Sequence, residues 1–421
     1  MSKRFLRTLC AILCIVLCLP IFTSCVVDTM YELGPYSLDE EEYAYLMCTH
    51  KRQILESLGL NEAYIDYPIA EDQSTTYGEY IEKVYREQFE QSVYSLIYAQ
   101  ALFDEYKLEL SEDEKNSINA IAGAIVYTYG EGSAERFNSL ASEYGFSKDT
   151  LYSIYEKQAK ESKVINYLLG ENYSKITDKQ KEEYYKENYI HFQTLVVNCL
   201  YQKNENGTFS NISEAERQTK LKLVEELTAF LCREDMTYNY VLLPKILKVD
   251  DMSSVTYEDI WNNPYINDDT AYVGGVYMPK PNIYQMASKN TLSQAMHTQE
   301  GDVSAIEAKR YFDGDGKITL GDSSETINKG DYFEYGTAFI KRLPMEEGAW
   351  KKEENKDFFS SNNFVGGAAK SALLAIFSEY EKLSPYTLVV NLELKEEFSL
   401  ITIPANRIDY DYFNQKEEEK E

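Results

Sequence analysis

The fold is decided by residues 147–197, SKDTLYSIYEKQAKESKVINYLLGENYSKITDKQKEEYYKENYIHFQTLVV, where the hydrophobic period changes. In the first part, apolar residues recur at helical spacing, as at Leu151, Ile154, Val164 and Leu168. Beyond Asn188 the period changes, and Phe192–Val197 is typical of the first strand of a β-containing unit. A helical half therefore precedes a mixed half, which predicts an α+β protein.

Local start signals place further helices upstream. Ser147 is a good N-cap, and Ser111–Glu114 and Thr177–Gln180 are capping boxes, in which side chains satisfy the first free N–H groups of a helix. The residues from Tyr77 to Leu108 carry one broad apolar stripe, which indicates a long amphipathic helix. The predicted helices in this half span residues 39–60, 77–108, 111–127, 134–144 and a segment starting at 147.

The mixed half alternates strands with helices. Predicted strands cover 192–201 and 335–342, with a helix from Ser213 and an apolar helix at 292–297. A helical pattern returns at 353–382. Residues 388–394 and 400–403 are predicted as strands or an extended tail.

The chain is strongly acidic, with 42 Lys and Arg against 70 Asp and Glu and a net charge of −28 over 421 residues. Such a field repels nucleic acid and anionic lipid, so nucleic acid is not expected as a partner. It could steer basic unfolded polypeptides toward the protein, or it could be an ordinary solvated surface. The length leaves room for two or three domains.

The N-terminus is typical of a secretion signal. A basic start with Lys3, Arg4 and Arg7 precedes an apolar run over 9–21 that is too short for an ordinary spanning helix. The run ends in Phe22-Thr-Ser-Cys25, which resembles a bacterial lipobox, although Phe22 replaces the usual Leu. We therefore predict lipidation at Cys25 and an extracytoplasmic protein anchored to the membrane. The alternatives are ordinary signal cleavage and an uncleaved anchor.

Cysteine and histidine usage gives little sign of catalysis or metal binding. Outside the leader and Cys25, three cysteines remain at Cys48, Cys199 and Cys232, and their spacing is not that of a metal site. Buried free thiols are the expected state. No nucleophile triad, zinc spacing, P-loop or dinucleotide fingerprint is present in the sequence, so neither a metal nor a cofactor is predicted.

The order of these patterns resembles the SurA/PrsA class of extracytoplasmic foldases. The resemblance rests on T-D-K-Q-x-x-x-Y-Y-x-E-N at 177–188 before an L-V-V strand, and on the helix order upstream. Downstream, a helix, Gly274-Gly275, an apolar helix, a Gly301 strand entry and a last strand at 335–342 follow in the order found in parvulin-type peptidyl-prolyl isomerase domains. The resemblance implies a helical chaperone domain, a parvulin-like α/β domain, and a C-terminal helix that packs back on the helical domain.

The resulting division of the chain has six parts. We expect a lipoprotein signal peptide (1–24), a tether (25–38), a helical chaperone-like domain (39–187), a parvulin-like domain with insertions (188–345), a C-terminal helix and strands that complete the helical domain (346–415), and a charged tail (416–421).

The residues expected to catalyse in a parvulin are the ones that differ here. The resemblance places the family's two strand histidines at Gln193 and Ala338. His191 could substitute after a register slip of two residues, which keeps it on the same strand face. His297 has no family counterpart. Isomerase activity is therefore expected to be weak or lost, and the candidate catalytic residues are His191, Gln193 and His297.

Two other segments have alternative interpretations. Met286, Leu292 and Met296 could form the floor of a proline-binding pocket, but apolar residues at these positions could equally form the core. The loop from Asp313 to Asp322 has acidic residues at intervals similar to those of a calcium loop, but it lacks the first carboxylate, so a β-hairpin is the preferred interpretation.

Three functions follow as hypotheses. The first is a membrane-anchored chaperone or foldase that binds unfolded secreted polypeptides, and the second is an active peptidyl-prolyl isomerase. The third is a non-catalytic ligand-binding lipoprotein. The 37 tyrosines suit a surface that grips varied peptides, although most can be half-buried residues on helix faces.

Overall fold

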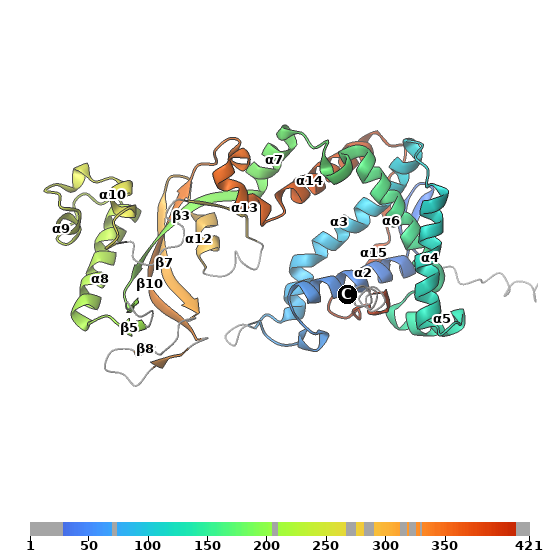
Figure 1. Ribbon diagram of the computed structural model, residues 1–421, viewed down its shortest axis with the longest axis horizontal. Coiled ribbons are helices and arrows are strands. Elements are labelled where there is room, and N and C mark those ends of the chain that lie inside the picture. Colours follow the sequence, from blue (N-terminus) through green and yellow to red (C-terminus); the bar gives the residue numbers. More distant parts are fainter. Residues whose placement is uncertain are drawn as a thin grey trace, which may run out of the picture. The chain divides into compact units, whose positions relative to one another are not determined.

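Figure 1 shows the chain as a computed structural model, which describes residues 28–69, 74–203, 209–266, 275–281, 290–311, 318–319, 326–328 and 331–409. Helices and antiparallel sheets are both present, so the predicted α+β class is confirmed. The chain forms two compact units. The first joins the chain up to Lys175 to the chain from Ala372 onward, and the second comprises Ile176–Ser371. In the part of the chain described, no helix is long and apolar enough to span a membrane.

The first unit is mainly helical. Its elements are β1 (Thr29–Leu33), β2 (Tyr36–Asp39), α2 (Glu40–Ser57), α3 (Tyr77–Glu105), α4 (Glu112–Tyr129), α5 (Ala134–Ala141), α6 (Lys148–Leu169), the second half of α14 (Phe364–Leu383), β11 (Leu388–Val390) and α15 (Leu392–Glu396). Short 3-10 turns lie at Glu62–Tyr64, Ser142–Tyr144 and Glu171–Tyr173. Buried aromatic rings hold these helices together. On α3, Phe89 meets Tyr43 edge-on at 5.1 Å and Tyr98 stacks on Phe377 of α14 at 6.0 Å.

The second unit is built on a four-stranded antiparallel sheet. Its strand order is β6 (Val276–Pro279), β3 (Tyr189–Asn198), β10 (Tyr332–Leu343) and β7 (Val303–Tyr311). Two small hairpins are β4 (Tyr201–Lys203) with β5 (Phe209–Asn211), and β8 (Ile318–Thr319) with β9 (Thr326–Ile327). Its helices are α7 (Asp178–Asn188), α8 (Glu214–Leu227) with a π-helical extension (Thr228–Cys232), α9 (Leu243–Leu247), α10 (Tyr257–Trp261), α12 (Thr291–His297), α13 (Lys356–Ser360) and the first half of α14. Further 3-10 turns lie at Met252–Ser254, Ala349–Lys351 and Glu353–Asn355.

The two faces of this sheet bury different residues of β3. Leu195 and Val197 pack in the core that includes α8, together with Phe339 of β10. Ile190 and Phe192 pack in another cluster with Ala295 of α12. Because side chains alternate along a strand, odd-numbered residues of β3 face α8 and even-numbered ones face α12.

The segments that enter and leave the second unit lie against each other. Tyr184 of α7 packs on Phe364 of α14, with ring centroids 5.6 Å apart. A Cβ added to Gly367, one turn further along α14, would lie only 2.1 Å from the Tyr184 hydroxyl. A larger residue at position 367 would therefore displace the Tyr184 ring.

Helix starts follow the predicted caps. Capping boxes form at Ser111–Glu114 and Thr177–Gln180, and Ser147 caps α6 together with Thr150. Ser213 likewise caps α8 through the N–H of Glu216. The side-chain caps read from the sequence were therefore sufficient to predict where these helices begin.

Three predicted segments differ from the structure. The segment expected as a tether contains β1 and β2, a hairpin in which β1 also pairs with β11. Beyond β11, Asn391 caps the short helix α15 by accepting the N–H of Leu394, so the predicted strand stops at Val390. Residues 400–403 form turns rather than a strand.

Residues 398–403 contact α2 and α3 within the first unit. The ammonium of Lys51, which is almost fully buried, donates to the carbonyls of Ile401 and Ile403 at 3.1 and 2.5 Å and pairs with Glu62 at 3.0 Å. On α3, Arg86 donates to the carbonyl of Phe398 at 2.8 Å. A buried ammonium requires such partners, so these contacts hold residues 398–403 against the helices.

Candidate functional site

His191 lies on β3 as a satisfied core residue. Its Nδ1 donates to the Pro344 carbonyl at 2.8 Å, and its ring stacks on Tyr277 of β6 with centroids 4.0 Å apart. The side chain is 7% exposed. Burial lowers the pKa of His191 more than the bond to the Pro344 carbonyl raises it, so the ring stays neutral near physiological pH.

The remaining ring nitrogen of His191 lies against the backbone of Gly275. A Cβ at Gly275 would lie 2.9 Å from Nε2, and the positive φ of +87° there also favours glycine. The second glycine of the Gly274-Gly275 pair is therefore explained by close packing on His191. This packing leaves little room for a substrate at that nitrogen.

Gln193 and Ala338 do not form one site. Ala338 pairs directly with Val196, whereas Gln193 pairs with Lys341. Residues three apart on a regular strand point to opposite faces, so Gln193 lies on the α8 face of the sheet and Ala338 on the α12 face. The two positions that the resemblance gives to the family's strand histidines therefore lie on opposite faces of this sheet, and their assignment stays a prediction. His191 does share the face of Gln193.

His297 is separate from both. It ends α12 with an exposed side chain, and its Nδ1 bonds to the carbonyl of Ser293 at 2.7 Å. Because α12 packs on the face opposite to His191, the two histidines belong to different sides of the sheet. Leu292 and Met296 of the same helix pack, half-buried, against the Ile190 cluster, as core residues do.

Three predicted sites lie outside the described residues. These are Cys25, Met286 and most of the loop from Asp313 to Asp322, of which Ile318–Thr319 forms β8. Among the residues that are described, no group of three or more His, Cys, Asp or Glu side chains is placed to hold a metal ion. The remaining cysteines Cys48, Cys199 and Cys232 are reduced thiols, of which Cys48 and Cys199 are buried.

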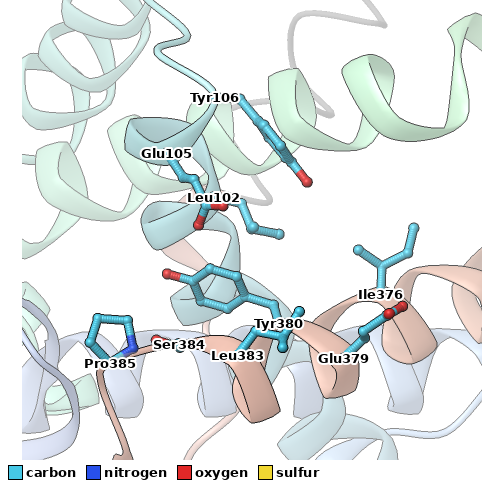
Figure 2. Close-up of a pocket in the computed structure, with 9 residues that line it drawn as sticks. All are labelled: Leu102, Glu105, Tyr106, Ile376, Glu379, Tyr380, Leu383, Ser384 and Pro385. Carbon is cyan, nitrogen blue, oxygen red and sulfur yellow. The ribbon is translucent and has the colours of Figure 1, made fainter.

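The first unit contains a pocket lined by apolar, aromatic and acidic side chains. It encloses about 350 Å³ between the C-terminal ends of α3 and α14 (Figure 2). Its lining consists of Leu102, Glu105, Tyr106, Ile376, Glu379, Tyr380, Leu383, Ser384 and Pro385. In Figure 2 the Tyr380 ring lies along one side of the pocket and Tyr106 projects toward it from α3. The pocket therefore combines an aliphatic and aromatic surface with two carboxylates.

The tyrosines of this pocket are neutral hydrogen-bonding groups. Burial raises the pKa of Tyr380 and Tyr106, and the nearby carboxylate of Glu105 raises both further. Neither Glu105 nor Glu379 forms an ion pair with a Lys or Arg among the described residues. The two carboxylates are exposed and are available to a positively charged ligand.

Exposed apolar side chains follow the pocket along the chain. Leu383 is 79% exposed, Val389 59% and Leu392 66%. Between them, Tyr386 covers Gly34 in the β1–β2 turn, where an added Cβ would lie 2.3 Å from its ring. These exposed apolar residues make the segment 383–392 a candidate interaction surface.

Sequence reasoning missed this pocket. Its two walls, 102–106 and 376–385, lie about 270 residues apart in the sequence, so no local pattern joins them. The available signal was a Glu-Tyr pair near the end of each wall helix, Glu105-Tyr106 and Glu379-Tyr380. An acidic-aromatic pair at the C-terminal end of a helix is unusual, because that end favours cations.

The solved structures that match this chain include foldases. No family model matches it, and neither does any curated protein. Among solved structures, foldase protein PrsA from Streptococcus pneumoniae str. Canada MDR_19A is 13% identical, with 79% of this chain and 98% of that one covered and a TM-score of 0.18. PrsA from Bacillus subtilis is 15% identical, with 75% and 93% covered and a TM-score of 0.17. The peptidylprolyl isomerase PrsA from Bacillus anthracis is 13% identical, with 69% and 97% covered and a TM-score of 0.22. Likeness of this size does not assign a function to this chain.

Proposed function

We propose that this protein is a membrane-anchored extracytoplasmic chaperone that holds unfolded secreted polypeptides. The observation that carries the proposal is the pocket between α3 and α14, which the exposed Leu383 lines and which the exposed Val389 and Leu392 follow in the sequence. An unfolded chain offers apolar side chains and backbone groups, which such a surface accommodates without a unique sequence. The acidic net charge repels nucleic acid and favours basic segments of a client.

Isomerase activity is proposed to be weak or absent. Rotation about a prolyl peptide bond must overcome a barrier of about 20 kcal/mol, so a catalyst needs side chains that converge on the twisted amide. His191 is buried under Tyr277 and bonded to a carbonyl, His297 belongs to the other side of the sheet, and Gln193 and Ala338 face opposite ways. A role of Met286, Leu292 and Met296 in gripping proline stays a prediction.

Anchoring is proposed to occur through a lipid on Cys25. The basic start, the short apolar run and the small residues before Cys25 support it. A Cys25→Ser variant would then lose acylation, detected by mass spectrometry, and would leave the membrane fraction. Retention of the variant in that fraction would favour an uncleaved anchor.

The test of the main proposal uses the full-length protein in two assays. Suppression of aggregation of a reduced, unfolded protein measures holding, and isomerisation of a proline tetrapeptide measures catalysis. We expect suppression at near-stoichiometric ratios and an isomerisation rate close to background, for wild type, His191→Ala and the exposed control His297→Ala alike.

Other outcomes separate the alternatives. Catalysis that is lost in His191→Ala but kept in His297→Ala would make the protein an active isomerase. Absence of both activities would remove the chaperone proposal and favour a ligand-binding lipoprotein.

A further inference from the structure

The strand β11 has an open edge. It is the outer strand of the sheet β11-β1-β2, and no other strand in the described part of the chain pairs with it. Asn391 donates to the Met30 carbonyl at 2.9 Å, and the register pairs Glu32 with Val389. Because hydrogen-bonded pairs alternate in an antiparallel ladder, the N–H and C=O groups of Leu388 and Val390 point away from β1.

This edge is close to the pocket. Pro385 lines the pocket, and β11 begins three residues later at Leu388. Three residues of chain span at most about 10 Å, so one extended peptide could pair with β11 and place a nearby side chain in the pocket. The position of Tyr386 over Gly34 fixes the connecting segment against the β1–β2 turn.

The charge around the pocket selects the kind of peptide. Glu105 and Glu379 are the charged residues of the lining, which contains no Lys or Arg. The neighbouring carboxylate of Asp104 accepts a hydrogen bond from Tyr36 at 2.9 Å. A ligand that presents a large apolar side chain near a cation therefore complements this surface better than a neutral or acidic one.

We propose that β11 and the α3–α14 pocket together bind an extended polypeptide segment by strand addition, with a large apolar residue in the pocket and a lysine or arginine nearby against Glu105 and Glu379. This inference rests on the proposed holding function and names its preferred client segment. Main-chain pairing supplies affinity without regard to sequence, and the pocket with its carboxylates supplies the preference.

The experiment measures binding of labelled nine-residue peptides to the full-length protein by fluorescence anisotropy. In the reference peptide Lys lies two residues from Leu or Phe, so that both side chains share one face of an extended strand, and a matched peptide carries Glu in place of Lys. A third peptide keeps the reference side chains but is N-methylated at alternate residues, which removes its pairing groups without any change to the protein.

We expect the Lys peptide to bind at least tenfold more tightly than the Glu peptide, with the difference reduced in high salt. N-methylation should abolish binding at the edge. The double variant Glu105→Gln/Glu379→Gln should weaken binding of the Lys peptide about three- to tenfold, as expected for two exposed charge contacts. The matched control Glu135→Gln/Glu143→Gln removes two exposed carboxylates elsewhere in the same unit and should leave binding unchanged.

A protein variant tests the edge independently. Val390→Pro removes one outward N–H, and proline is tolerated where that group faces solvent, so β1–β11 pairing should persist. Unchanged circular dichroism with at least fivefold weaker peptide binding supports strand addition. Binding that is indifferent to N-methylation and to this variant overturns it.

The outcomes also separate this inference from the proposed function. Aggregation suppression without any preference for Lys over Glu peptides overturns the inference and leaves the holding function intact. Failure to suppress aggregation and to bind any peptide overturns both. A concentration-dependent dimer that disappears in Val390→Pro would assign the edge to a second copy of this chain and overturn the proposed occupant.

Discussion

Glu90 of α3 joins side chains from several elements of the first unit. It accepts hydrogen bonds from Tyr31 of β1, from Tyr43 of α2 at 2.8 Å and from Arg86 at 2.9 Å, and it pairs with Lys395 of α15 at 2.9 Å. Burial alone would raise the pKa of Glu90, but the bonds from Tyr31, Lys395 and Tyr43 outweigh burial and lower it. One carboxylate thereby holds the N-terminal hairpin and the C-terminal helix to α3.

A Glu90→Gln variant should lose this support at neutral pH, by about 1.5–3 kcal/mol, as for hydrogen bonds to a charged group. Since the pKa of Glu90 is lower in the folded protein, its contribution is complete above the unfolded-state pKa and is lost as the pH falls through the folded-state value. Urea midpoints at pH 7 should therefore differ between wild type and variant, and the difference should shrink toward pH 3. The exposed Glu87→Gln on the same helix is the control, and an equal shift there would contradict the interpretation.

Single residues of this kind were hard to predict from sequence. Glu226 lies in α8 among predicted apolar positions, yet it is fully buried and accepts the N–H groups of Val241, Leu242 and Leu243. Its partners lie 15–17 residues further on, in a segment with no regular period. Sequence spacing gives no signal for a carboxylate that caps a distant loop.

At the scale of elements, the β1–β2 turn depends on Gly34. Its φ is +61°, and the Tyr386 ring would lie 2.3 Å from an added Cβ. Glycine is favoured there both by backbone conformation and by the close approach of the ring.

We expect Gly34→Ala to lower stability by more than the roughly 1 kcal/mol of left-handed strain alone, because Tyr386 must also move. Gly59→Ala is a matched control, since its φ is +64° and nothing lies within 4 Å of its added Cβ. The larger fall in the urea midpoint should belong to Gly34→Ala. Equal effects of the two variants would mean that the ring contact contributes nothing.

Helices were predicted better than strands for a physical reason. A capping box such as Ser111–Glu114 is complete within four residues, so its structure follows from sequence alone. The strand β1 acquires its pairing from Leu388–Val390 at the other end of the chain, and a window around residues 25–38 contains no trace of that partner. The candidate pocket was not predicted for the same reason, because its walls come from two distant segments, 102–106 and 376–385.

At the scale of the whole molecule, the two units differ in continuity. The second unit is one stretch, Ile176–Ser371, whereas the first needs segments from both sides of it. Pro344, β10 and α12 complete the second unit without any residue from the first.

Truncation of the chain after Leu383 should therefore lower the stability of the first unit only. The truncated chain loses β11, α15 and the carbonyls of Ile401 and Ile403 that hold Lys51. We expect amide hydrogen exchange in α2 and α3 to accelerate about tenfold or more, while β3 and β10 keep their protection. Equal acceleration in both units, measured by mass spectrometry, would show that they fold as one.

The pairing of Tyr31 with Val390 also sets an order of events during synthesis. A hairpin made early must wait for its third strand until nearly all of the chain has emerged, and closing so long a loop costs conformational entropy. Folding of the intervening stretch relieves that cost, because its entering Tyr184 and departing Phe364 come to lie side by side. Folding of the second unit therefore shortens the effective loop that must close when β11 pairs with β1. Until β11 pairs with β1, both edges of the nascent hairpin are open, and the unfinished chain exposes backbone groups that can pair with other chains.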